Sequence, residues 1–251
     1  MSDFFAPTRD FIIEVQKGRV PGHRIVTSRG HNQVVGTVAE DIWNQGGIYS
    51  WLDVDTVMTL SSSSADDTAL GTGARTVRLY GLDADFNEIN EVITLNGQTP
   101  VSTVNSYLRV YDMIVLTADS SNQAYNIGDI YVGTGTVTAG VPAVVHLHMV
   151  AAENRTQACR YTIPAGHTAY MLEHHFSVVG NNVAAECFIF SRVFGQVFTI
   201  RRRLMVVENN HIFRGYAVLP EKSDIVARAY VSQGSTDIAS FFALLLVKND
   251  P

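Results

Sequence analysis

The sequence predicts an all-β protein built from antiparallel β-sandwich or jelly-roll domains, preceded by an extended N-terminal arm. Three observations support this fold class. Apolar residues make up 46% of the 251 positions, which is enough for a sizeable core. Strand-length apolar segments alternate with clusters of Gly, Asn, Asp and Ser, as in antiparallel sandwiches. Helix signals are confined to single turns at 39–43 and 101–108.

Residues 1–55 are predicted to form the arm. Proline and glycine interrupt each short apolar piece of this segment, so no helical or strand period persists. The segment is nevertheless rich in aromatic side chains, which are costly to leave in water. We therefore expect it to pack along a neighbouring subunit; the alternative is that it packs on its own sandwich. The expected anchors are Phe4, Phe5, Phe11, Trp43 and Trp51.

Residues 56–141 are predicted to form a first β-sandwich. Its strands are expected at 57–60, 74–80, 88–95, 107–116 and 126–132. Asn96 and Gly97 form the dipeptide most typical of a two-residue hairpin, so a tight hairpin is expected there. The following stretch, 133–142, is Gly-rich and uncharged, which is the composition of a linker or a corner. We therefore place a domain boundary in it.

Residues 142–251 are predicted to form a second, jelly-roll-like sandwich. Eight candidate strands lie in this part of the chain, which is the number in a jelly roll. They are expected at 144–150, 159–163, 168–178, 184–190, 196–205, 211–219, 225–231 and 238–247.

The charge balance narrows the classes of function. Charged residues make up only 17%, against roughly 25% in an average soluble domain. Interface cores are depleted in charge, so this composition favours surfaces covered by other subunits; the alternative is that Thr-rich strands are simply common in β proteins. The net charge of −6 argues against direct nucleic-acid binding. No apolar run approaches a membrane span of roughly 18 residues, and no secretory signal is recognised at the N-terminus.

No catalytic, cofactor or metal site is expected, and therefore no enzyme. His146 and His148 share a strand face, but no third ligand follows at a metal-binding spacing. Cys159 and Cys187 lie on predicted strands, where free cysteine is usually a small buried group. The acidic run 83–88 resembles part of a calcium loop but lacks its glycine and its distal glutamate, so a plain turn is favoured.

One basic run interrupts this weakly charged sequence. It consists of Arg201, Arg202 and Arg203. On a strand, Arg201 and Arg203 share one face and Arg202 lies on the other. In a chain of net negative charge we expect these arginines to form ion pairs with another subunit; an acidic partner surface and DNA are the alternatives.

Two parts of the chain resemble virion structural proteins of tailed bacteriophages, especially phages of marine bacteria and cyanobacteria. The first comprises 17–23 (KGRVPGH), 40–49 (EDIWNQGGIY), 61–65, 72–77 (TGARTV) and 81–83. The second comprises 151–157 and 161–170 (YTIPAGHTAY). These motifs carry no catalytic residues.

The resemblance implies a β-sandwich protein located in the virion and assembled in the host cytoplasm. It implies most directly a capsid cement or decoration protein, forming a homotrimer whose arms bind the major capsid protein or other virion proteins. An alternative within the virion is a tail, neck, baseplate or fibre-attachment protein. A third possibility, from another class, is a carbohydrate-binding module that grips the host surface.

Overall fold

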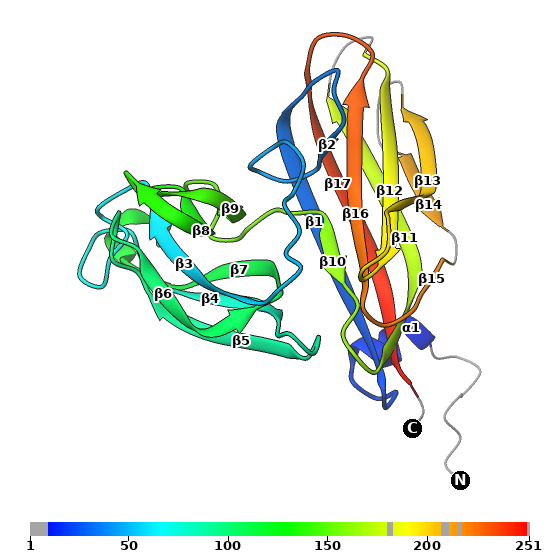
Figure 1. The fold of residues 1–251 in the computed structure, drawn as a ribbon, viewed down its shortest axis with the longest axis horizontal. Helices are drawn as coiled ribbons and strands as arrows, with labels where there is room; N and C mark the ends of the chain where they lie inside the picture. The colour runs from blue at the N-terminus through cyan, green and yellow to red at the C-terminus, as the bar shows by residue number, and fades with distance from the viewer. Residues whose placement is uncertain (1–9, 180–182, 207–210, 215–216, 250–251) are drawn as a thin grey trace.

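The computed structural model describes residues 10–179, 183–206, 211–214 and 217–249. Two antiparallel β-sandwiches lie side by side (Figure 1). Strands form because core-facing and outward residues alternate: in β17 (Thr236–Lys248), Ile238, Phe242, Leu244 and Leu246 point into one core, while Phe241, Leu245 and Val247 are partly exposed on the other side. The all-β antiparallel class predicted from the sequence is confirmed.

The larger sandwich is a jelly roll of two facing sheets. Its strands are β1 (His23–Val35), β2 (Glu40–Asp41), β10 (Arg160–Thr162), β11 (His167–Val179), β12 (Ala185–Val193), β13 (Thr199–Val206), β14 (His211–Arg214), β15 (Val218–Leu219), β16 (Ser223–Val231) and β17. The sheet orders are β1-β17-β11-β14, with β15 on β11, and β10-β16-β12-β13, with β2 on β16. Counted along the chain, the eight main strands run 1-8-3-6 and 2-7-4-5, which is the interleaved order of a jelly roll.

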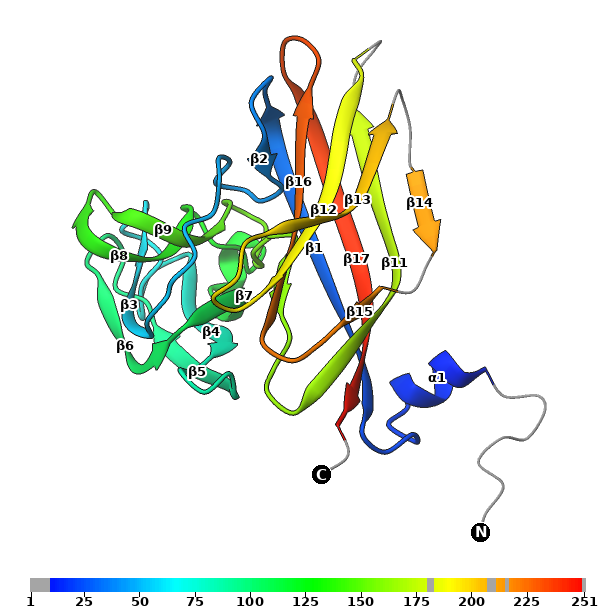
Figure 2. The ribbon, with the colours of Figure 1, turned by 45° about the vertical axis from the view of Figure 1, so that its right-hand side comes forward.

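The smaller sandwich, here called the insert, interrupts the jelly roll between β2 and β10. Its strands are β3 (Thr56–Ser62), β4 (Ala74–Leu82), β5 (Glu88–Thr94), β6 (Val101–Tyr107), β7 (Arg109–Ala118), β8 (Ile130–Thr138) and β9 (Val141–Met149), with a 3₁₀ turn at Ser120–Asn122. They form the sheets β6-β3-β8-β9 and β5-β4-β7. Each sandwich has its own apolar core. Figure 2 shows the insert beside the β1 edge of the jelly roll.

The expected arm is not an arm over its described length. Residues 11–16 form the helix α1 (Phe11–Gln16), capped by the Asp10 carboxylate, which accepts hydrogen bonds from the amides of Ile12 and Ile13. β1 pairs with β17 over its whole length, and β2 pairs with β16, so this segment supplies two strands of the jelly roll. Local sequence could not show this, because the partner strand lies about two hundred residues away.

The boundary expected at 141/142 falls inside a hairpin. Thr138 pairs with Val141, and the two residues between them, Ala139 and Gly140, have φ values of 48° and 82°. Two successive positive φ values define the type I′ turn that joins antiparallel strands. The Gly-rich stretch is therefore a β8–β9 connection, and the strand expected to open the second domain belongs to the insert.

Three other local predictions differ from the structure. Gly97 has a φ of 60°, but its amide bonds the Asp67 carbonyl and the turn joins β5 to β6, which lie in different sheets, so it closes no hairpin. The single helical turns at 39–43 and 101–108 are instead the strands β2 and β6.

Within the described ranges, no helix has the length and apolar character needed to cross a bilayer.

Candidate functional site: the junction of the two sandwiches

A buried ion cluster joins the insert to the jelly roll. Arg109 of β7 donates from Nε and Nη2 to the two carboxylate oxygens of Asp224 on β16, at 2.8 and 2.9 Å. Asp224 also accepts from Arg192 Nε at 2.9 Å and from the Thr162 hydroxyl at 2.7 Å. Arg109 and Asp224 are 2% and 0% exposed, so their charges are compensated by each other and not by water. We call Arg109, Asp224 and Arg192 the junction cluster.

Aromatic rings pack against this cluster. The guanidinium groups of Arg109 and Arg192 lie 5.1 and 5.5 Å from the centroid of the Trp51 ring, which also contacts the Phe198 ring at 5.3 Å. Such cation–π contacts are stronger where water is excluded. Trp51 is one of the anchors expected from the sequence, and the structure places its ring at the junction, against arginines of both sandwiches.

A second buried arginine stands beside the first. The Arg160 guanidinium lies 3.8 Å from the ring centroid of Tyr49 and 4.8 Å from that of Trp43, and it donates to the His146 carbonyl. Burial, with a smaller contribution from Arg160, lowers the pKa of His146 to about 4. Trp43 is 3% exposed and donates from its indole to the Gly47 carbonyl, so it also packs on its own body.

The remaining expected anchors are placed as follows. Phe11 lies partly buried on α1, and its ring meets the His23 ring edge-to-face at 5.9 Å. Phe4 and Phe5 lie outside the described residues. Of the described anchors, Trp43 and Trp51 thus pack between the sandwiches, and Phe11 contacts the first residue of β1.

The arginine run lies on β13, at the edge of its sheet. Arg203 pairs with Glu186 at 2.6 Å and lies 5.8 Å from the Phe188 ring centroid, and Arg201 donates to the Ser191 hydroxyl at 2.6 Å. Arg202 is partly buried on the other side of the strand. Arg201 and Arg203 are exposed, but each already has a partner in its own chain.

The histidine and cysteine side chains that the sequence offered for metal binding or catalysis are packed against other side chains or buried. His148 stacks on Tyr131 at 4.7 Å and lies 3.2 Å from Asp129. Burial raises the pKa of both the Cys159 and the Cys187 thiol to about 12, which disfavours the nucleophilic thiolate. Among the described residues, no three His, Cys, Asp or Glu side chains are arranged to hold a metal ion.

The acidic loop at 83–88 is a self-bonded turn. The Asp83 carboxylate accepts from the amides of Asp85 and Asn87 and from the Asn87 side chain. This is the Asx-type turn favoured by the sequence.

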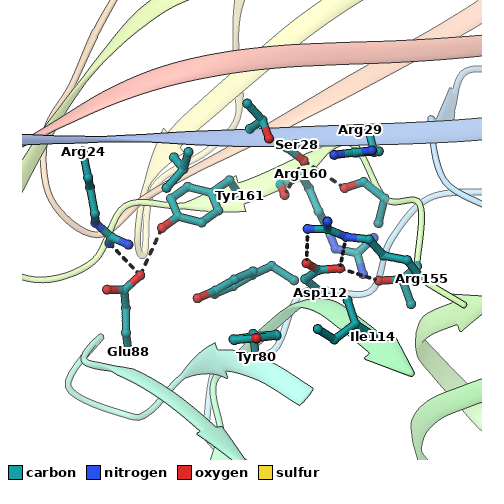
Figure 3. Close-up of a pocket in the computed structure, with 15 residues that line it drawn as sticks. Arg24, Ser28, Arg29, Tyr80, Glu88, Asp112, Ile114, Arg155, Arg160 and Tyr161 are labelled. Atoms are coloured by element: carbon teal, nitrogen blue, oxygen red, sulfur yellow. Dashed lines mark hydrogen bonds and ion pairs between the residues drawn. The ribbon is translucent and has the colours of Figure 1, made fainter. Parts of the chain in front are cut away.

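A groove separates the insert from the edge of the jelly roll (Figure 3). It has a volume of about 370 Å³, and β1, β4, β7 and the segment 155–161 line it. At one end of the groove, Glu88 forms an ion pair with Arg24 at 2.6 Å and accepts a hydrogen bond from the Tyr161 hydroxyl at 3.3 Å. At the other end, Asp112 pairs with Arg155 through both oxygens, at 3.2 and 2.6 Å. We call this the interdomain groove.

Tyrosines form the middle of the interdomain groove. Tyr111 and Tyr161 meet edge-to-face at 5.1 Å, and Tyr80 lines the insert side. Burial, reinforced by the neighbouring Glu88 carboxylate, raises the pKa of Tyr111 and of Tyr161, so both hydroxyls remain protonated donors. Sequence reasoning missed these residues, because they come from strands of two different domains; only the tyrosine content was visible beforehand.

An apolar face covers the outside of the β1–β17–β11 sheet. Direct pairing places Ile25 beside Leu245, Leu245 beside Tyr170, and Phe241 beside His175. These residues alternate with the core-facing ones and therefore point away from the core. We define the apolar face as Ile25, Tyr170, Phe241, Ala243, Leu245 and Val247. The sequence signal for it was the nearly continuous apolar run 241–247, which was interpreted only as a buried strand.

Comparison with known proteins gives no close relative. No family model matches the chain, and no curated protein matches it. The VP2 subviral particle of infectious bursal disease virus is similar at 10% identity, covering 92% of this chain and 73% of that chain with a TM-score of 0.23. The structure of the Gt strain of the same virus is similar at 10% identity, covering 96% and 78% with a TM-score of 0.22.

Proposed function

We propose that the chain is a non-enzymatic structural protein of a tailed-phage virion, and within the virion a cement or decoration protein that stabilises the head. The observation that carries this proposal is the apolar face. It combines partly exposed aromatic and aliphatic side chains across three adjacent strands, with Arg29 and Glu173 beside them on the same face. Contiguous apolar surface of this kind usually marks an interaction site.

A second copy of the chain is the proposed occupant of the apolar face. An apolar surface is compatible with its own copy because it needs no charge of opposite sign. Burial stabilises such a contact by roughly 25 cal/mol per Å² of apolar area. Many modest contacts repeated around a shell add up, since multivalent attachment strengthens the whole without any strong single contact. Homotrimers that also contact the major capsid protein are the form proposed.

The junction cluster supports the same role. A buried, charge-compensated contact between insert and jelly roll makes the two sandwiches one block, since opening it would expose or isolate the charges of Arg109 and Asp224. A block that does not bend at its junction can brace neighbouring subunits at fixed distances.

The assembly step is tested by sedimentation velocity on the purified chain. We expect an oligomer of wild-type chain and a monomer after Leu245→Glu, which places a charge in the middle of the apolar face, between Ile25 and Tyr170. The matched control is Val104→Glu, because Val104 is 90% exposed on the insert. Monomeric wild-type chain, or an oligomer unaffected by Leu245→Glu, would contradict the role of the apolar face.

The location is tested by immunogold labelling of purified virions. Label distributed over the head is expected for a cement protein. Label confined to the tail would replace this assignment with the tail, neck, baseplate or fibre-attachment alternative. Virions that bind no antibody, while the purified chain does, would contradict a virion role altogether.

A further inference from the structure

We propose that the interdomain groove is a binding site for an acidic saccharide. This inference does not rest on the proposed assembly role, since it needs only the residues that line the groove; of these, Arg29 also lies beside Phe241 of the apolar face. Its volume of about 370 Å³ falls within the roughly 300–1,000 Å³ of small-ligand sites.

The two ends of the groove offer the hydrogen-bond donors and acceptors that sugar hydroxyl groups need. A sugar hydroxyl donates one hydrogen bond and accepts others, so it needs donors and acceptors together. The Arg24–Glu88 pair supplies both at one end, and the Asp112–Arg155 pair supplies both at the other. Asp112 is further fixed by the Thr156 hydroxyl at 3.1 Å, so the carboxylate is held in place before a ligand arrives.

The middle of the groove matches the apolar faces of a sugar ring. Tyr80 of β4, which is partly exposed, and Tyr161 of β10, which is 5% exposed, lie on opposite walls (Figure 3), so Tyr80 offers the accessible ring face. Tyrosine offers a large, stiff contact surface with a polar tip at a low entropy cost. The sequence did not favour the carbohydrate alternative, because its Tyr and Trp residues lie mostly on predicted strands or in the expected arm; the fold gathers three tyrosines, Tyr80, Tyr111 and Tyr161, in one groove.

The charge of the groove predicts an acidic ligand. Four arginines line it against two carboxylates, in a chain whose net charge is −6. Arg24 and Arg155 are paired with those carboxylates, and Arg160 is buried below. Arg29 is exposed, and among the described residues it forms no hydrogen bond or ion pair, so its planar guanidinium is available to a ligand carboxylate.

An acidic peptide strand fits the groove less well. A peptide would have to pair along the free edge of β1. The Ser28 hydroxyl donates to the carbonyls of Ala158 and Arg160, both at 3.0 Å, which brings the segment 158–160 against β1 at that level. An added strand would meet this segment, whereas a compact sugar occupies the space beside it.

The test uses the full chain on an array of neutral and uronic-acid-containing glycans, followed by titration with oligogalacturonate. We expect competable binding to the acidic glycans. Arg29→Ala should weaken it about tenfold or more, because a charge-assisted hydrogen bond is lost. Tyr80→Ala should weaken binding to a similar degree. The control Arg19→Ala removes the same charge from an ion pair with Glu14, neither of which lines the groove, and should leave affinity unchanged.

Three results would overturn the proposal. They are absence of competable binding across the array, equal affinity of wild type and Arg29→Ala for oligogalacturonate, and binding of oligoglutamate that matches oligogalacturonate and is lost in the same variants. The last result would identify an acidic peptide site instead. Far-ultraviolet circular dichroism of each variant checks that the fold is intact, and Arg29→Lys, which keeps the charge, should retain part of the affinity.

Discussion

At the scale of single residues, buried polar side chains have protonation states that differ from those in the unfolded chain. His146 is an example: it is 1% exposed on β9, beside Arg160 and with its ring 5.8 Å from that of Tyr49. A protonated imidazole would place a second positive charge next to a buried guanidinium. The folded protein therefore keeps this histidine neutral down to a pH of about 4.

This arrangement predicts an acid-sensitive stability. The unfolded chain binds a proton at His146 below a pH of about 6.5, whereas the folded chain does not until about 4. The contribution of neutral His146 is therefore fully present above pH 6.5 and declines as the pH falls toward 4, by about 3 kcal/mol in total. Urea unfolding between pH 8 and 4 should show this decline in wild type and a flatter profile in His146→Gln.

The comparison of the two proteins at pH 8 provides the control, because the histidine is neutral in both folded and unfolded chains there. The difference in unfolding free energy at pH 8 reports only packing. If the difference in unfolding free energy between wild type and His146→Gln stays constant down to pH 4, folding does not lower the pKa of His146.

At the scale of elements, turn geometry decides where strands pair. The β8–β9 hairpin closes because Ala139 and Gly140 both adopt positive φ. A Cβ on Gly140 would also lie 1.9 Å from the Ser62 carbonyl oxygen of β3, so the hairpin packs against the neighbouring strand at that point. Two independent constraints therefore favour glycine at position 140: the positive φ of its backbone and the lack of space for a side chain.

Gly140→Ala should therefore cost about 2–5 kcal/mol, the sum of the left-handed backbone penalty and the steric overlap. The matched control is Gly166→Ala. Gly166 has a φ of 70°, but no atom of the described residues lies within 4 Å of the place that a methyl group would take there. This control should cost only about 1–2 kcal/mol. Urea denaturation midpoints measure both, and equal losses would show that the contact with Ser62 does not matter.

For the whole molecule, the central feature is that one sandwich is inserted into the other. The chain leaves the jelly roll after β2, builds the insert, and returns at β10. The two connections, after β2 and before β10, and the junction cluster hold the insert against the jelly roll. Both tryptophans of the chain, Trp43 and Trp51, lie at this junction. Tryptophan fluorescence therefore reports on the junction, while circular dichroism reports on all strands.

We expect the two signals to change together in wild type, as for one cooperative unit. Arg109→Ala should lower the unfolding free energy by about 3–5 kcal/mol, because it leaves Asp224 buried with less compensation, and should move the fluorescence transition to lower urea than the dichroism transition. Arg155→Ala breaks an exposed ion pair and should cost less than about 1 kcal/mol. Coincident transitions in Arg109→Ala would show that the cluster does not couple the sandwiches.

The sequence by itself determined the all-β class and the approximate position of most strands, because alternation of apolar and polar residues is a local property. It also indicated the turns, since Gly and Asn at positive φ are local requirements; even so, Asn96-Gly97 joins two sheets while the Gly-rich stretch at 133–142 contains the true hairpin.

Only the tertiary structure decided which strands pair and which side chains meet. Alternation tells which residues share a face of a strand, but it does not identify the neighbouring strand. β1 therefore looked like part of an arm until its pairing with β17 was seen, and Trp43 and Trp51 looked free for another subunit. The interdomain groove, the apolar face and the junction cluster each combine residues far apart in the chain, and contacts of that kind form only when distant strands come together.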